Sequence, residues 1–354
     1  MAMQAPTPEI TIAGHKVGPA HPPFVIAEMS ANHNGDIERA FRIIKAAKEA
    51  GADAVKIQSY TADTITIDHD GPGFMIEGGL WDGNSLYRLY ESAQTPWDWH
   101  PALFEKGREL GLIVFSSPFD FMAVDMLSGL DAPAYKIASF ELLDLPLVRK
   151  CAATGKPLIM STGMARLHEI GEAVDAARHD GATEIALLHC TSGYPTPPEE
   201  SDLRTIPHLA AAFGAATGLS DHTPSIGASV AAVALGACII EKHFTLSRAD
   251  GGPDAAFSLE PDELASLCSN VRLAWQALGR IRYVTSPSEQ RNVQFRRSLY
   301  IVEDMKAGEP LSPDNLRSIR PGFGLAPKHY DSLLGKRVSR DVTRGTPMTW
   351  DLIG

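Results

Sequence analysis

Cysteine is scarce in this sequence, and segments that would carry the chain to or across a membrane are missing. Only four of the 354 residues are cysteines, and no two of them form a CxxC pair. We therefore expect neither a disulfide framework nor a structural zinc site, and each thiol should be reduced and packed. No apolar run approaches the roughly 18 residues of a membrane span, and the first residues lack the pattern of a signal peptide. These absences predict a cytoplasmic protein without membrane contact.

An excess of positive charge is missing as well. The sequence has 32 Lys and Arg residues and 43 Asp and Glu residues. The resulting net charge of −11 argues against nucleic acid as a partner. The charge is uneven, because residues 286–354 carry 11 basic and 8 acidic side chains whereas residues 1–285 carry 21 and 35. We therefore expect an acidic main domain followed by a small basic one.

The glycine-rich motifs of common nucleotide-binding folds are also absent, since the sequence contains neither GxGxxG nor GxxxxGK[ST]. It contains instead eight short apolar, β-rich runs, at residues 24–28, 54–59, 113–117, 134–139, 157–162, 184–191, 216–222 and 238–245. Each run is followed by a helical pattern, at residues 36–50, 99–110, 120–130, 144–154, 166–180, 202–213, 225–236 and 260–279. Eight such units in about 260 residues predict an α/β fold, a (β/α)8 TIM barrel. An open, doubly wound sheet is the alternative.

Two segments interrupt the repeat. Residues 60–98 are too long for a simple connection, and we interpret them as either a substrate lid or a passive excursion. Residues 286–294 are polar and read as a linker. We therefore predict a barrel domain over residues 1–285, and a small domain of short β runs and turns over residues 295–354.

The carboxyl ends of barrel strands form the active site of this fold, and here they carry two lysines, Lys56 and Lys136. A lysine inside a strand must desolvate its ammonium group, which is costly unless an anion compensates. With serine hydroxyls between them, the two lysines suggest a clamp for phosphate or carboxylate. A buried ion pair, for instance with Glu28, and a Schiff-base lysine are the alternatives.

Two histidines, His222 and His243, end adjacent predicted strands, and the carboxylates of Glu28 and Glu241 are available beside them. This donor set predicts an open site for a divalent ion and would suit Mn²⁺, Co²⁺ or Fe²⁺ as well as Zn²⁺. Mn²⁺ is our first expectation, with Co²⁺ or Mg²⁺ as alternatives. An anion clamp next to a Lewis acid predicts the making or breaking of a carbon–carbon bond in a phosphorylated or carboxylated substrate.

The motifs at these strand ends resemble those of the sialic acid synthase family, the nonulosonic acid synthases. They lie at residues 26–35, 51–58, 135–139, 161–164, 188–191, 218–222 and 241–245, and the tail motif Arg320-Pro-Gly-Phe-Gly resembles the antifreeze-like (SAF) domain of these enzymes. The family condenses phosphoenolpyruvate with an amino sugar. Glu28-Met-Ser-Ala-Asn-His and Ser192 are most similar to the pseudaminate branch. Neuraminate and legionaminate synthases are the alternatives.

The resemblance implies a role for each matching position. Glu28, Lys56, Lys136 and Glu141 would be the catalytic residues, and His222 and His243 would bind the metal. The substrates would contact Gln58, Ser117, Ser139, Ser161, Ser192, Tyr194, Ser220, Asp254 and Arg320. Arg320 would reach the amino sugar of a partner subunit, which implies a domain-swapped homodimer.

Three other classes of protein remain as alternatives. A metal-dependent aldolase would use similar residues but would release pyruvate and no phosphate. A 3-deoxy-octulosonate phosphate synthase would share the barrel, although such enzymes generally lack this tail. The tail alone would fit a non-catalytic ice-binding or carbohydrate-binding protein, which would have no use for Lys56, Lys136, His222 and His243 at one barrel mouth.

Overall fold

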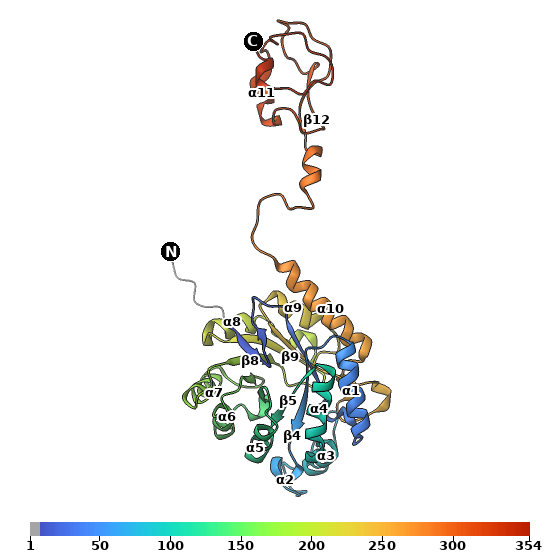
Figure 1. The fold of residues 1–354 in the computed structure, drawn as a ribbon, viewed down its shortest axis with the longest axis vertical. Helices are drawn as coiled ribbons and strands as arrows, with labels where there is room; N and C mark the ends of the chain where they lie inside the picture. The colour runs from blue at the N-terminus through green and yellow to red at the C-terminus, as the bar shows by residue number, and fades with distance from the viewer. Residues whose placement is uncertain (1–7) are drawn as a thin grey trace. The chain divides into compact units, whose positions relative to one another are not determined.

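The computed structural model describes residues 8–354, which divide into two compact units (Figure 1). The first unit ends at Gly279, and the second spans Arg280–Gly354. The sequence prediction ended the barrel domain at residue 285 and began the small domain at residue 295, so the second unit also contains the predicted linker. Each unit is described here by itself.

The first unit is a closed barrel of eight parallel strands in the order β10-β3-β4-β5-β6-β7-β8-β9. The strands are β3 (Phe24–Glu28), β4 (Ala54–Ser59), β5 (Ile113–Pro118), β6 (Tyr135–Ile137), β7 (Leu158–Ser161), β8 (Ile185–Cys190), β9 (Ala216–Asp221) and β10 (Ile239–His243). The ends of each strand lie within two residues of the range predicted from the sequence. The prediction of a TIM barrel is therefore confirmed, and the open sheet is wrong.

Eight helices surround the barrel and bury one face each against it. They are α1 (Ile37–Glu49), α4 (His100–Leu110), α5 (Phe121–Gly129), α6 (Leu145–Ala152), α7 (Leu167–His179), α8 (Thr205–Phe213), α9 (Gly227–Ala234) and α10 (Pro261–Leu278). Helix α1 shows why they form: the side chain of Asp36 caps it by accepting a bond from Glu38 N, and Ala40, Ile43, Ile44 and Ala47 are buried along one stripe. Across residues 8–354, every helix is too short or too polar to cross a membrane.

A short hairpin that the sequence analysis missed packs against the barrel interior. Strands β1 (Ile10–Ile12) and β2 (His15–Val17) pair antiparallel, and Ile10, Ile12 and Val17 belong to the same buried cluster as Phe115 and Ile239. Its backbone reaches Glu184, just ahead of β8, through the bond that Thr11 N donates. The hairpin therefore closes the amino-terminal end of the barrel. Three-residue strands carry too little periodicity to predict.

The long segment over residues 60–98 is folded. Helices α2 (Ala62–Ile65) and α3 (Leu86–Ala93) lie together at one end of the barrel (Figure 1). Between them the chain doubles back through the isolated bridge of Met75 with Ser85. Trp81 Nε1 donates a hydrogen bond of 3.0 Å to Pro253 O, in the loop after β10. The segment is thus attached to the loop that follows β10, two strands from β4 around the barrel.

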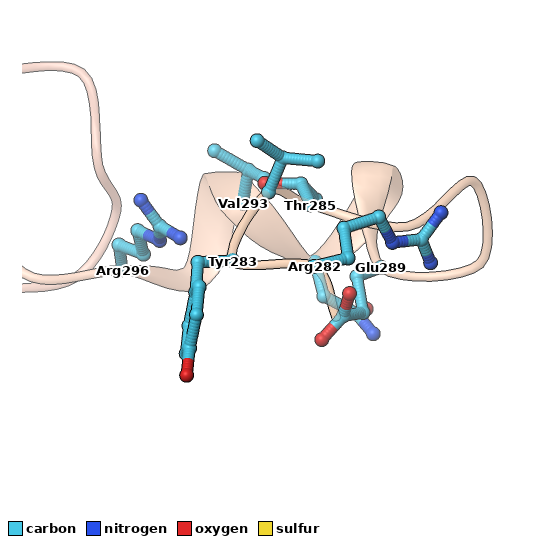
Figure 2. A pocket seen from close by; sticks show the side chains of 8 residues that line it. Arg282, Tyr283, Thr285, Glu289, Val293 and Arg296 are labelled. Carbon is cyan, nitrogen blue, oxygen red and sulfur yellow. The ribbon is translucent and has the colours of Figure 1, made fainter. Parts of the chain in front are cut away.

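The second unit has its own small core. Strands β11 (Ser298–Ile301) and β12 (Leu316–Ile319) pair antiparallel, and α11 (Tyr330–Leu333) packs beside them. Its buried residues include Leu299, Ile301, Leu316, Leu333, Val338 and Met348. Residues 280–296 precede this core, and they include a 3-10 helix at Gln290–Phe295 within the predicted linker. Figure 2 shows an open pocket in this stretch, lined by Arg282, Tyr283, Glu289 and Arg296 among others.

Candidate active site

Four buried ionic side chains meet inside the barrel near the carboxyl ends of its strands. Lys56 on β4 lies 2.7 Å from Glu28 Oε2 on β3, and its ammonium group is 3.6 Å from Glu241 Oε1 on β10. Lys136 on β6 lies 3.6 Å from the same oxygen of Glu241. Glu241 is therefore shared by both predicted clamp lysines, and the buried ion pair that the sequence left as an alternative to the clamp is present.

Burial and charge act in opposite directions on these groups. Burial raises the pKa of Glu28 to about 7, although Lys56 opposes the effect. Burial alone would raise the pKa of Glu241 too, but Lys136 and Lys56 outweigh it and hold that pKa below its ordinary value. Burial lowers the pKa of Lys136. Glu241 is thus the permanent anion of the cluster, whereas Glu28 can take up or release a proton near neutral pH.

The predicted serines line the same end of the barrel. Lys56 donates to Ser117 Oγ at 3.2 Å, and Lys136 donates to Ser161 Oγ at 2.7 Å. Ser220 donates to Glu241 Oε1 at 3.4 Å. Each lysine therefore has a hydroxyl and a carboxylate beside it, and the group can enclose a small anion that competes with Glu241 for the ammonium groups.

Gly163 holds two more of the predicted serines close together. Its backbone nitrogen donates to Ser139 Oγ at 3.1 Å. A Cβ at this position would overlap Ser192 Oγ and would lie 2.7 Å from Ser139 Oγ. The absence of a side chain at Gly163 is therefore what allows both hydroxyls to occupy the same corner of the site.

Gly163→Ala is expected to raise the KM for the anionic substrate by about 10- to 100-fold, because it displaces both hydroxyls by a fraction of an ångström or more. Steady-state kinetics would measure the change. Gly129→Ala is the matched control, since a Cβ there at the end of α5 meets no atom within 4 Å. An unchanged KM in folded Gly163→Ala would contradict the role of this corner.

The two histidines predicted to bind a metal lie side by side. Their ring centroids are 5.4 Å apart, and His222 Nδ1 is 3.0 Å from Thr191 O. Because a carbonyl can only accept, His222 carries its proton on Nδ1 and leaves Nε2 free as a donor to a metal. His243 Nδ1 is buried without a hydrogen-bond partner in the described part of the chain, and burial holds the pKa of this ring well below its ordinary value. Burial alone would lower the pKa of His222, but its contact with Cys190 outweighs burial and raises that pKa. In its neutral form each ring has a free nitrogen that fits a divalent ion.

Within residues 8–354, however, no group of three or more histidine, cysteine, aspartate or glutamate side chains could hold a metal. Asp254 Oδ2 lies 3.9 Å from His243 Nδ1. The protein would therefore supply two nitrogen ligands, and an ion bound there would keep positions open for water or substrate.

A cavity of about 470 Å³ opens beside the histidines. The remaining barrel residues of the prediction line it, namely Gln58, Glu141, Tyr194 and Asp254. Gln58 donates to Glu28 Oε1 at 3.1 Å and so connects the cavity to the ionic cluster. Burial raises the pKa of Glu141 to about 7. A protonated Glu141 can therefore donate to a substrate oxygen in the cavity.

Arg320 belongs to the second unit, where it is exposed directly after β12. The other predicted site residues all belong to the first unit, which brings them together at the barrel mouth. The prediction that Arg320 serves a partner's site stays a prediction.

Sequence reasoning placed Glu241 beside the predicted metal site, but it missed the contacts of Glu241 with the two lysines. It also missed the apolar side chains that residues 60–98 contribute to the cavity. The signal for Glu241 was present, because it alternates with Lys242 on β10 and so shares a face with His243. Asp221, at the end of β9, is turned away from the site and pairs with Lys242 on the other face of the sheet.

A (β/α)8 barrel with a buried lysine–glutamate cluster, a histidine pair and an adjacent cavity is the architecture of a barrel enzyme that acts on an anionic substrate. The NeuB family matches residues 43–283, and the SAF domain matches residues 296–354. The chain belongs to the NeuB family, and the resemblance that the sequence motifs indicated is confirmed.

Several characterised relatives are similar over nearly the whole chain. The pseudaminic acid synthase of Campylobacter jejuni is 46% identical over 91% of this chain and 94% of its own. The pseudaminic acid synthase of Helicobacter pylori is 41% identical over 93% of this chain and 97% of its own. The N,N'-diacetyllegionaminic acid synthase of C. jejuni is 39% identical over 90% of this chain and 96% of its own.

Solved structures agree with this assignment. The N-acetylneuraminic acid synthetase of Leptospira borgpetersenii has a TM-score of 0.73 and 32% identity, covering 82% of this chain and 96% of that one. The spore coat polysaccharide biosynthesis protein spsE of Bacillus subtilis has a TM-score of 0.67 and 36% identity, covering 98% of this chain and 99% of that one.

Proposed function

We propose that this protein is a transferase that condenses phosphoenolpyruvate with 2,4-diacetamido-2,4,6-trideoxy-L-altrose to give pseudaminic acid and phosphate. The observation that carries the proposal is the 46% identity to the C. jejuni pseudaminic acid synthase over 91% of the chain. Identity to the legionaminic acid synthase of the same organism is lower, at 39%. Phosphoenolpyruvate is made in the cytoplasm, where we expect the reaction to take place.

In the proposed reaction, C3 of phosphoenolpyruvate attacks the aldehyde carbon of the open-chain sugar, and the aldehyde oxygen takes up a proton. Water adds at C2, and the tetrahedral intermediate releases phosphate by cleavage of its C–O bond. Lys56 and Lys136 would neutralise the phosphate and carboxylate groups, with hydroxyls from Ser117 and Ser161 beside them. Holding two substrates in one pocket would supply a further part of the rate enhancement.

Proton transfer would fall to the two carboxyl groups whose pKa values burial raises to about 7, Glu28 and Glu141. A group with a pKa near the working pH is present in both protonation states, which suits general acid–base catalysis. Glu141 lines the cavity that would hold the sugar, and Glu28 lies beside Lys56. We propose Glu141 as the donor toward the sugar oxygen and Glu28 as the group that orients the attacking water.

We further propose a divalent ion, Mn²⁺ in the first place, bound by His222 and His243. Their two free ring nitrogens support this assignment. Such an ion would polarise the aldehyde carbonyl of the sugar. Tyr194 packs against His222 with ring centroids 4.4 Å apart and would keep that ring in place.

The second unit would complete the site of a partner copy. We propose a domain-swapped homodimer in which Arg320 reaches the N-acyl group of the partner's sugar. Exposure of Arg320 on the second unit is compatible with this role.

A panel of amino sugars with phosphoenolpyruvate would test the proposed function, read out by phosphate release and product mass. We expect the highest kcat/KM with the diacetamido trideoxy acceptor. Best turnover with N-acetylmannosamine would reassign the product to neuraminate, and pyruvate release without phosphate would indicate an aldolase instead.

Removal of divalent ions with a chelator is expected to abolish turnover, and Mn²⁺ should restore it. The reason is that two imidazoles alone cannot polarise a carbonyl as a divalent ion does. His243→Ala should bind Mn²⁺ at least about tenfold more weakly in a titration followed by calorimetry. Full activity of metal-free protein would contradict the assignment of His222 and His243.

A further inference from the structure

The cavity beside the histidine pair has two unlike sides. One side comes from the barrel and combines the polar side chains of Gln58, Glu141 and Asp254 with apolar ones such as Phe119 and Phe140. The other side is aliphatic and comes from the segment over residues 60–98. We call this second side the apolar wall, and define it as Ile65, Ile76, Leu86 and Leu89.

Regular backbone structure positions the apolar wall. Leu86 and Leu89 are three residues apart on α3, a spacing that places both on one face of a helix together with Tyr90 and Ala93, which also line the cavity. The side chain of Ser85 caps this helix by accepting a bond from Arg88 N.

The strand-like stretch before α3 holds Ile76 in place. Ile76 N donates to Asn84 O at 2.9 Å, and Leu86 N donates to Phe74 O at 2.8 Å. The hydrogen bond from Trp81 Nε1 to Pro253 O then fixes this stretch next to Asp254, on the polar side of the cavity. The apolar wall is thus held at a set position in the cavity lining.

The four wall residues are partly exposed, and they line the space that the proposed sugar would occupy. Aliphatic groups offer a ligand no hydrogen bond. A ligand methyl group that packs against them makes binding more favourable. A hydroxyl in the same place makes binding less favourable, because it loses its hydrogen bonds to water and gains none in return. A wall of this kind therefore selects among sugars by their apolar substituents.

We propose that the apolar wall determines which sugar the protein accepts, by receiving the methyl group at the deoxygenated end of the acceptor and the methyl of a neighbouring N-acyl group. The inference rests on the proposed function and adds to it the residues that select the sugar, Ile65, Ile76, Leu86 and Leu89. The polar side binds the remaining oxygens, and the segment over residues 60–98 supplies the selectivity.

The test compares two acceptors that differ only at C6, the 6-deoxy sugar and its 6-hydroxy counterpart. The native protein should prefer the 6-deoxy sugar in kcat/KM by about 10- to 100-fold, which is the range that an apolar pocket achieves against an added hydroxyl. Ile76→Thr and Leu89→Asn each place a hydrogen-bonding group in the wall, and each should reduce this preference at least about fivefold. The change should appear in the KM for the sugar, while the KM for phosphoenolpyruvate stays constant.

Ile67→Thr is the matched control, because Ile67 belongs to the same segment, is 60% exposed and does not line the cavity. It should keep the native preference. Because the two wall variants change separate positions, the test remains possible if one of them misfolds. Thermal unfolding would show whether each variant is folded.

The outcomes separate the two proposals. If the native protein releases no phosphate with any acceptor, the proposed function fails. If it is active but shows no preference between the two sugars, or if both folded wall variants discriminate as the native protein does, the inference about the wall is overturned and the proposed function stands.

Discussion

Lys136→Met is expected to lower kcat/KM by about a thousandfold while the protein remains folded. Lys136 is 2% exposed, and its ammonium group lies 2.7 Å from the hydroxyl of Ser161 and 3.6 Å from the shared carboxylate of Glu241. Its charge is thus held ready for an anionic substrate. Removing one preorganised donor of this kind costs about 10²- to 10³-fold in rate, and Lys136 also neutralises charge in the bound state.

Folding should survive this substitution, because Glu241 keeps Lys56 as a partner at 3.6 Å. Kinetics at saturating and limiting phosphoenolpyruvate would measure the loss, with circular dichroism as the check on folding. Turnover within about tenfold of the native value in folded Lys136→Met would show that the cluster is structural.

A second substitution of Lys136 tests the proposed domain swap. Lys136→Ala and Arg320→Ala proteins, each inactive alone, should recover activity when their subunits exchange. Hybrid dimers combine one intact barrel with one intact second unit, so up to about one quarter of the native activity is expected. No recovery despite proven exchange would refute the swap.

Lys242→Met is expected to have the opposite effect, a loss of stability by about 3 kcal/mol. Lys242 Nζ lies 2.9 Å from Asp221 Oδ2, with side-chain exposures of 0% and 1%, and donates to the carbonyls of Thr223 and Ser225. Methionine is of similar length but leaves the carboxylate of Asp221 buried without its counter-charge. Chemical denaturation at neutral pH would measure the change.

A double-mutant cycle tests the contribution of this ion pair more directly. Asp221→Asn in the Lys242→Met background removes the uncompensated charge and should restore at least half of the lost stability. Turnover per folded molecule should fall far less in Lys242→Met than in Lys136→Met. A Lys242→Met protein as stable as the native one would mean that the ion pair contributes nothing net to the fold.

Lys136 and Lys242 show how much can be predicted from the sequence alone. Both lie in strands, and the residue type does not distinguish their roles. Strand alternation separates them, because Glu241 and His243 share one face of β10 and Lys242 must take the other. The pattern thus predicts which residues share a face, but the partner across the sheet depends on how neighbouring strands align. Here β9 places Asp221 directly opposite Lys242.

The eight strand–helix units were predictable because each depends on local signals. Apolar runs bounded by turns form parallel strands covered on both faces, and stripes such as Ala40, Ile43, Ile44 and Ala47 form amphipathic helices. The hairpin at Ile10–Val17 was not predictable, because its pairing is stabilised by burial against the barrel interior rather than by its own periodicity. The fold of residues 60–98 depends on long-range contacts of the same kind, above all the bond between Trp81 and Pro253.

The sequence by itself determined the barrel, the family and the residue types at the strand ends, because strand ends and chemistry are both local properties of the chain. Only the tertiary structure decided how those residues combine. It joined Lys56 and Lys136 through one carboxylate, Glu241, which lies more than 100 residues away from either. It also turned Asp221 away from the site and placed aliphatic side chains of residues 60–98 in the same cavity as Glu141. Closing the barrel brings the first strand beside the last, so these contacts exist only in the complete fold.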